Sequence, residues 1–318
     1  MLKKNNLIIL TAVVVISLLL SGMVSAQGTT FLSIATGGTS GTYYPIGGAI
    51  AKVLNENIEG MNASAQSTGA SVTNTRLIYN ESVELAILQN DIASYAVNGE
   101  NQFAENQVKN MEGIAALYPE VIQIIVRDDA GIENIQDLKG KKVAVGAPGS
   151  GAEANAKQIL EFFDLTYEDI EEDYLSFSEA ASRLKDRQID AAFLTAGIPT
   201  AAVMDVASTQ DISLLNFSDE ELNSLNSEYP YLTGVTVPAG TYTGLDEEVQ
   251  TVALKAILVA DSGLSEDVVY NITKAIFENR DTLIAAHDRA KDIKLESSLD
   301  GMTVELHPGA QKYYDEAK

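Results

Sequence analysis

The sequence predicts an α/β protein with two lobes, and three observations support this prediction. Strand and helix patterns alternate along most of the chain, which is typical of α/β sheets. The chain has 318 residues, of which 46% are hydrophobic, whereas a single core stops growing near roughly 250 to 300 residues. Two glycine-rich turns, TGGTSGTYYPIGG at residues 36–48 and GAPGSGAE at residues 146–153, each stand where a strand should end and a helix should begin.

The first 26 residues have the pattern of a secretory signal peptide. Two lysines precede an apolar run over residues 7–20, and Val24-Ser25-Ala26 offers the small residues that a signal peptidase reads. We therefore expect an exported mature chain that starts at Gln27. An uncleaved membrane anchor is the alternative, although about 14 apolar residues are fewer than the roughly 20 that a spanning helix needs.

The mature chain is expected to be strongly acidic. Cleavage takes the formal charge from -24 to -26, because residues 1–26 contain two lysines and no Asp or Glu. This charge argues against binding to nucleic acid, whose affinity comes from Lys and Arg, and equally against docking on anionic lipid. An excess of surface carboxylates is typical of a solvated, salt-tolerant surface.

The sequence contains few residues that could serve as catalytic groups or metal ligands. The chain has no cysteine, which excludes disulfides and a lipid-modified N-terminal cysteine, and its two histidines do not form a metal-binding pattern. We expect His287 on a helix surface and His307 in a turn. The run Glu171-Glu172-Asp173 is expected to be a solvated face. We therefore expect a soluble monomeric binding protein with no catalytic residue, no metal and no cofactor.

The first elements form β-loop-α units. A strand is expected at residues 31–35, and Pro45 then opens a helix whose apolar residues share one face. Strands at residues 63–67 and 84–89 follow. A helix is expected near Ser71 and another near Asp91, because both residues are good N-caps.

The second half repeats this alternation. An apolar run, VIQIIVR, follows Pro119. The remaining expected elements are strands at 142–145 and 189–195, helices at 152–163 and 178–185, and a helix opened by Pro199.

The glycine turns have a physical interpretation as anion sites. A helix start leaves about four N–H groups unpaired, and glycines let a ligand approach them. The second turn is not a Walker A loop, because Ala152 stands where the phosphate-binding lysine belongs. Gly149, Gly151 and Ala154 also fit G-x-G-x-x-A, but this dinucleotide motif is short and weak in an exported chain.

Many segments together resemble the solute receptors of TRAP transporters of the TAXI type. The resemblance covers almost the entire mature chain and is specific in the order and spacing of its segments. These segments are TGGTSGTYYPIGGAIAKVLNE, STGAS, LAILQNDIASYAVNG, IAALYPE, DLKGKKVAVGAPGSG, IDAAFLTAGIP, PAGTYTG and LHPGAQKYY.

The resemblance implies a two-lobed periplasmic-binding-protein fold of type II, with a ligand cleft between the lobes. Such a protein delivers a solute to a TRAP membrane permease driven by an ion gradient, and known members bind glutamate, glutamine or 2-oxoglutarate-like acids. From the strand pattern, lobe 1 is expected at residues 27–124 with 229–318, and lobe 2 at residues 125–228.

The cleft is expected where the strand ends and glycine turns of both lobes meet. Tyr44 is favoured over Tyr43 as an aromatic wall, although either tyrosine could instead be a core residue, and Ser67 and Gln89 could instead cap loops. The candidate binding residues are Gly37, Gly38, Thr39, Tyr43, Tyr44, Ser67, Gln89, Gly149, Ser150, Gly151, Thr195 and Gly197.

Several alternatives stay open at this point. Other TRAP receptors hold a carboxylate with an arginine, but Arg127 ends a strand and Arg183 lies within a helix on the sequence pattern. The chain could also be an exported enzyme on the same fold. It could equally be the binding protein of another transporter class, since thiamine-precursor and sulfonate receptors use related folds.

Overall fold

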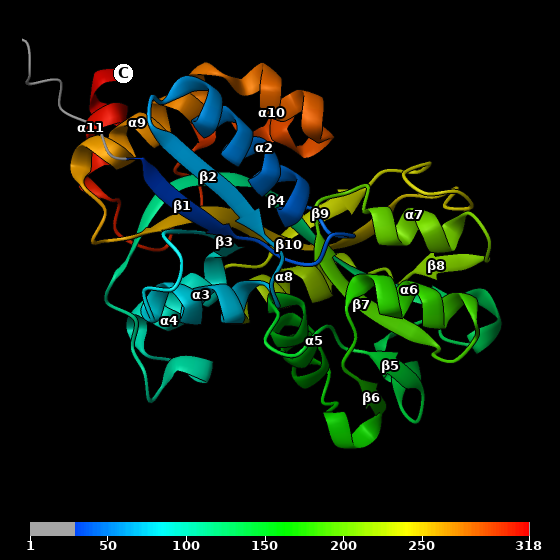
Figure 1. Ribbon diagram of the computed structural model, residues 1–318. Coiled ribbons are helices and arrows are strands. Elements are labelled where there is room, and N and C mark those ends of the chain that lie inside the picture. The colour runs from blue at the N-terminus through cyan, green and yellow to red at the C-terminus, as the bar shows by residue number, and fades with distance from the viewer. Residues whose placement is uncertain (1–28, 318) are drawn as a thin grey trace, which may run out of the picture. The chain divides into compact units, whose positions relative to one another are not determined.

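A mixed β-sheet organises the structure, a computed structural model that describes residues 29–317. The predicted signal peptide lies outside the described residues. The described part of the sheet has ten strands, ordered β2-β1-β3-β10-β4-β7-β5-β6, with β9 beside β10 and β8 beside β4 (Figure 1). The strands are β1 (Thr30–Ala35), β2 (Met61–Gln66), β3 (Leu85–Gln89), β4 (Met111–Arg127), β5 (Lys142–Ala144), β6 (Glu171–Asp173), β7 (Ala191–Ala196), β8 (Ile212–Leu214), β9 (Thr233–Val237) and β10 (Val249–Asp261).

Helices cover both faces of this sheet. α2, α9, α10 and α11 share one hydrophobic cluster with β1 and β3, while α3 and α4 pack on the opposite face of those strands. The helices are α2 (Tyr43–Asn57), α3 (Ser71–Tyr79), α4 (Asn90–Asn98), α5 (Gly151–Phe162), α6 (Phe177–Lys185), α7 (Ala201–Ala207), α8 (Asp219–Glu228), α9 (Glu266–Glu278), α10 (Arg280–Ala286) and α11 (Pro308–Ala317). Within residues 29–317, no helix combines the length and the apolar character needed to cross a membrane.

Two long strands connect the halves of the sheet. β4 pairs with β10 through its first part and with β7 from Val121 onward, and all these pairings are antiparallel. β10 in turn pairs with β9 at its start and with β3 near its end. The outer strands are parallel, as between β1 and β3 and between β5 and β7. The sheet is therefore parallel at its edges and antiparallel at its centre.

The two ends of each of these long strands pack into different hydrophobic clusters. Ile114 and Tyr118 of β4 pack with β1, α2 and α9, whereas Val121 and Ile125 pack with α6 and α7. On β10, Leu254 belongs to a core with α5 and α8, while Ala256 belongs to the core with α2. Each half of the sheet therefore has its own apolar core.

Local sequence explains where several helices begin. Ser176 caps α6 by accepting a bond from the Glu179 N–H, and the Glu179 side chain bonds back to the Ser176 N–H. Ser218 and Glu221 form the same reciprocal pair at the start of α8. Such capping boxes satisfy N–H groups that a helix start leaves unpaired.

Candidate functional site

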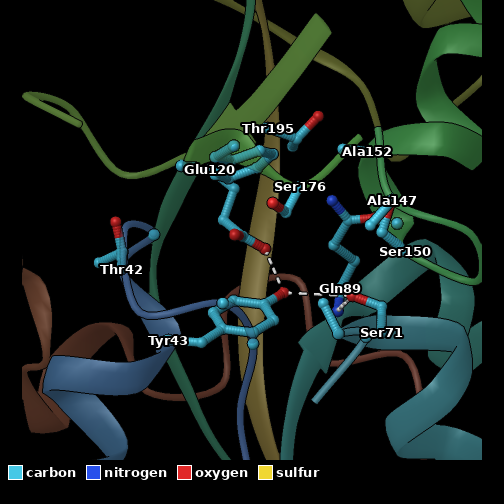
Figure 2. Close-up of a pocket in the computed structure, with 18 of the residues that line it drawn as sticks. Thr42, Tyr43, Ser71, Gln89, Glu120, Ala147, Ser150, Ala152, Ser176 and Thr195 are labelled. Atoms are coloured by element: carbon cyan, nitrogen blue, oxygen red, sulfur yellow. Dashed lines mark hydrogen bonds between the residues drawn. The ribbon is translucent and has the colours of Figure 1, made fainter. Parts of the chain in front are cut away.

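A cavity of about 90 Å³ lies where strands β1, β3 and β7 end and helices α2, α3, α5 and α6 begin. Such a volume holds several water molecules or a small solute. Strand ends facing helix starts are the usual ligand position in open α/β sheets. The cavity is lined by Gly37, Gly38, Gly41, Thr42, Tyr43, Thr68, Gly69, Ala70, Ser71, Gln89, Glu120, Ala147, Ser150, Gly151, Ala152, Ser176, Phe177, Thr195 and Ala196 (Figure 2).

The first glycine turn supplies one wall. Tyr43, the first residue of α2, is buried and lines the cavity, whereas the neighbouring Tyr44 is exposed and does not. α2 lies close against β1, because a Cβ on Gly47 would come within 2.4 Å of the Thr36 Cγ2 atom. This close packing sets the position of the start of α2, and with it the direction of the Tyr43 ring.

The Tyr43 hydroxyl reaches a buried carboxyl group on the central strand β4. It donates a 2.6 Å hydrogen bond to Glu120 Oε2 and lies 3.3 Å from the Ser71 Oγ atom (Figure 2). Burial raises the pKa of Glu120 to about 8, the Tyr43 bond opposes this shift, and the charge of Asp91 adds to it. Burial and the charge of Glu120 also raise the pKa of Tyr43. At neutral pH the cavity therefore contains a protonated carboxyl group.

The second glycine turn lies next to Gln89, the last residue of β3. A Cβ on Gly151 would stand only 1.8 Å from Gln89 Oε1, so a larger residue here would displace the end of the Gln89 side chain. Gln89 donates from Nε2 to Asn155 Oδ1 on α5 at 3.0 Å, while its buried Oε1 accepts no hydrogen bond. The cavity therefore contains an acceptor without a donor.

The start of α5 contributes main-chain donors. Ser150 caps this helix, because its side chain accepts a bond from the Glu153 N–H at 3.1 Å. Gly151 and Ala152 are the first two residues of α5 and line the cavity, so their N–H groups have no partner within the helix. Ser150 is therefore occupied as the cap, and the two following N–H groups are available to an anion.

The third strand end adds one more unpaired group. Thr195 of β7 lines the cavity, and its buried hydroxyl has no hydrogen-bond partner. Buried polar groups in folded proteins usually have partners. Two buried polar atoms of this cavity, Gln89 Oε1 and Thr195 Oγ1, nevertheless have no partner within the described part of the protein.

The structure brings only part of the sequence-based candidate set to the cavity. The predicted residues on its wall are Gly37, Gly38, Tyr43, Gln89, Ser150, Gly151 and Thr195. The predicted residues outside its lining are Thr39, Tyr44, Ser67, Gly149 and Gly197.

Three of the residues outside the lining have a supporting position. Ser67 Oγ donates to the Gly37 carbonyl at 3.0 Å and so fixes the first turn. The carbonyl of Gly149 accepts from the Thr73 N–H at 3.1 Å, and that of Gly197 accepts from the Thr42 hydroxyl at 3.4 Å. These bonds join the two glycine turns to elements on the other side of the cavity.

No lysine, arginine or histidine is among the described residues that line the cavity. Arg127 pairs with Asp129 and Asp190, and Arg183 pairs with Asp173. His307 is buried elsewhere, with its Nε2 atom 3.1 Å from the Leu264 carbonyl. Among residues 29–317 no cluster of three potential metal ligands is present.

Glu120 is the main site residue that sequence reasoning missed. The segment IAALYPE was noted only as part of a family pattern, yet it ends on this carboxylate between two buried apolar stretches of β4. A charged residue in a continuous buried strand is rare unless it has a partner or a function. That contrast is a signal from which the residue could have been identified.

Comparison with known proteins gives one family match. The model of the NMT1-like family matches residues 34–317. This range includes every residue that lines the cavity.

Solved structures with low sequence identity share the fold. A protein from Bordetella bronchiseptica RB50 is similar with a TM-score of 0.55 at 16% identity, over 87% of this chain and 83% of that one. A binding protein component of an ABC phosphonate transporter from Pseudomonas aeruginosa gives 0.51 at 11% identity, over 82% and 79%. A putative L-cystine ABC transporter from Listeria monocytogenes gives 0.51 at 14% identity, over 83% and 98%. The predicted fold class, a two-lobed α/β binding-protein fold, is confirmed.

Proposed function

Because the chain belongs to the NMT1-like family, we propose that it is an exported solute-binding protein that captures a small organic acid or amino acid and delivers it to a membrane permease. The observation that supports this most strongly is the cavity itself. It joins four helix starts and contains two unpaired buried polar atoms, and its lining has no histidine, cysteine or lysine. Such a site is suited to binding a small solute.

The proposed permease is of the TRAP type, driven by an ion gradient, and the proposed receptor class is TAXI. This part of the proposal rests on the sequence resemblance. The proposed solute is glutamate, glutamine or a 2-oxoglutarate-like acid, whose carboxylate would accept bonds from the N–H groups of Gly151 and Ala152. Short-range donors have to overcome the acidic charge of the chain, which opposes an anion at long range.

Two lobes that close on the solute complete the proposal. Lobe 1 would comprise residues 27–124 with 229–318, and lobe 2 residues 125–228. β4 leaves one hydrophobic cluster and enters another near residues 118–121, and β10 does so near residues 254–256, which supports two separately packed lobes. The position on β10 favours a return of the chain to lobe 1 later than residue 228.

A binding protein of an ABC transporter is the second candidate. The fold likeness to the ABC phosphonate-binding component at a TM-score of 0.51 favours keeping it. The two candidates differ in the energy source of the permease, because TRAP uptake needs an ion gradient and ABC uptake needs ATP.

The test has two stages. The mature chain is purified, its retained small molecules are identified by mass spectrometry, and binding is measured by titration calorimetry after their removal. We expect one small acid or amino acid bound per chain, without steady conversion to product. Uptake into vesicles with the permease encoded beside it should then require an ion gradient. Uptake that follows ATP instead would support the second candidate, and turnover of the bound molecule would contradict both.

A further inference from the structure

The cavity contains a buried carboxyl group, Glu120, which a site that binds only simple acids does not require. It is 2% exposed, it lines the cavity, and Tyr43 is the one described residue that bonds to it. Its neighbour on β10 in the sheet register is Leu254, which offers no charge. Burial raises the pKa of this carboxyl group and so favours its neutral form, whereas a cation supplied by a ligand would stabilise the carboxylate.

Gln89 places a second acceptor in the same cavity. Its orientation follows from a chain of bonds, since Asn155 donates to Asp91 Oδ2 at 3.1 Å and therefore presents its own oxygen to Gln89 Nε2. The Gln89 Oε1 atom is thereby turned toward Gly151 and is left unpaired. A carboxylate or carbonyl oxygen of a ligand cannot satisfy this atom, whereas an N–H donor can.

The cavity therefore has two chemically different sides. The N–H groups at the start of α5 offer hydrogen bonds to an anion, with Gln89 Oε1 beside them, whereas the Glu120 carboxyl group on the Tyr43 side offers an acceptor to a cation. A protonated amino group has three donors and a positive charge, which suits the carboxylate. The solute that matches both sides is an amino acid in its zwitterionic form.

We propose that Glu120 binds the protonated amino group of the solute and loses its own proton on binding, so that the site selects an amino acid over the matching 2-oxo acid. This inference rests on the proposed solute-binding function. The proton leaves the Glu120 carboxyl group for the solvent, and the amino group keeps its three hydrogens. The ionised carboxylate keeps the hydrogen bond that Tyr43 donates to it.

The groups around Glu120 allow its titration to be observed separately. Tyr43 on α2 and Tyr118 on β4 are buried, and burial raises the pKa of both, so they stay neutral. Asp91 on α4 has its pKa raised by burial to about 6, below that of Glu120 at about 8. Arg289, on the 3-10 helix Asp288–Asp292 that also contacts β4, pairs with Asp292 at 3.1 Å. Asp91 does not line the cavity, so Glu120 is the lining group whose pKa lies closest to neutral pH.

The test compares matched solutes on the mature protein by titration calorimetry. The common L-amino acids are screened first, and the tightest is compared with its own 2-oxo acid. We expect the amino acid to bind at least tenfold more tightly. We also expect about one proton to be released per solute near pH 7, measured in two buffers of different ionisation enthalpy. Its affinity should rise by up to about tenfold per pH unit between pH 6.5 and 7.5 by linkage.

Two variants separate this role from a structural one. Glu120→Gln keeps the shape and an oxygen for Tyr43, so we expect it to lose the proton release, the pH dependence and at least tenfold in affinity for the amino acid. Tyr118→Phe removes a nearby buried hydroxyl that has no partner and does not line the cavity, and it should change none of these. The 2-oxo acid should bind the parent and Glu120→Gln with similar affinity.

Each outcome decides between the proposals. If the 2-oxo acid binds as tightly as the amino acid, or if the amino acid binds without releasing a proton, the role of Glu120 is overturned while the solute-binding function stands. If no amino acid or oxo acid binds at all, both proposals fail. Should Glu120→Gln not fold, the comparison of the two solutes on the parent protein still decides.

Discussion

The hydroxyl group of Tyr43 donates a 2.6 Å hydrogen bond to the buried carboxyl group of Glu120. The two residues come from different elements, because Tyr43 begins α2 and Glu120 lies within the central strand β4. The bond therefore links the first glycine turn to the middle of the sheet. It also places a main polar contact of the cavity where neither residue's local sequence would indicate it.

Replacing Tyr43 by Phe should weaken solute binding by about tenfold or more, because a hydrogen bond to a charged group contributes roughly 1.5 to 3 kcal/mol. The neighbouring Tyr44→Phe is the matched control, since Tyr44 is exposed and does not line the cavity. Titration calorimetry on both variants measures the effect. A loss of affinity in Tyr44→Phe with none in Tyr43→Phe would mean that the cavity wall is assigned to the wrong tyrosine.

Gly151→Ala should weaken binding at least tenfold, equivalent to about 1.4 kcal/mol. The new Cβ would stand 1.8 Å from Gln89 Oε1 and would displace that side chain from the start of α5. Gly48→Ala is the control, because this glycine is inside α2 and a Cβ on it would have no other atom within 4 Å. That control should bind normally and gain up to about 1 kcal/mol of stability. Equal affinities in the parent and Gly151→Ala would place the solute elsewhere.

The stability of the parent protein should fall relative to Glu120→Gln as pH rises from about 5 to 8. The folded protein keeps a proton on Glu120 up to about pH 8, whereas the unfolded chain releases it above about pH 4 to 5. The contribution of the protonated group to the free energy of unfolding is therefore lost between about pH 5 and 8, at about 1.4 kcal/mol per pH unit. Above about pH 8 there is no further loss.

Urea unfolding of both proteins at several pH values measures this difference in the free energy of unfolding. Carboxyl groups that do not interact with Glu120 are present in both proteins and cancel in the comparison. Parallel pH profiles for the parent and Glu120→Gln would show that the carboxyl group is not buried in its neutral form.

Gly197→Val should weaken binding without altering the cavity lining. A Cβ on Gly197 would come within 2.6 Å of the Arg289 Cγ atom, and these residues belong to different proposed lobes. The collision should disfavour the arrangement in which the lobes are together. Small-angle scattering should show the parent contracting when solute is added and the variant contracting less.

A second substitution tests the cause of this effect. Arg289→Ala removes the side chain that the new valine would meet, so the double variant should recover much of the lost affinity. No recovery would mean that Gly197→Val acts through β7 itself and not through the contact between lobes.

Short-range patterns predicted most of the elements near the cavity. The helix expected after Pro45 begins two residues earlier, at Tyr43. The helix expected near Ser71 has Ser71 as its first residue, but Ala70 and not Ser71 occupies the N-cap position. The two long strands were harder to predict from the sequence. β10 was not predicted, and β4 was noted only after Pro119, because an apolar run that is buried on both faces has no period to read.

The candidate site was predictable only where main-chain geometry determines it. Glycine turns and strand ends pointed to Gly37, Gly151 and Thr195, which do line the cavity. The choice between Tyr43 and Tyr44 depends on the rotation of α2 against β1, which the sequence does not state. Glu120 reaches the cavity through the pairing of β4 with β10 and β7, which is a long-range property of the sheet.

The most direct test is a crystal structure of the mature protein with the solute that it retains. We expect electron density for one small molecule in the cavity, with its carboxylate within hydrogen-bond distance of the Gly151 and Ala152 N–H groups. Its amino group should contact Glu120. A solute found outside this cavity, or one that contacts neither Glu120 nor the start of α5, would contradict the account.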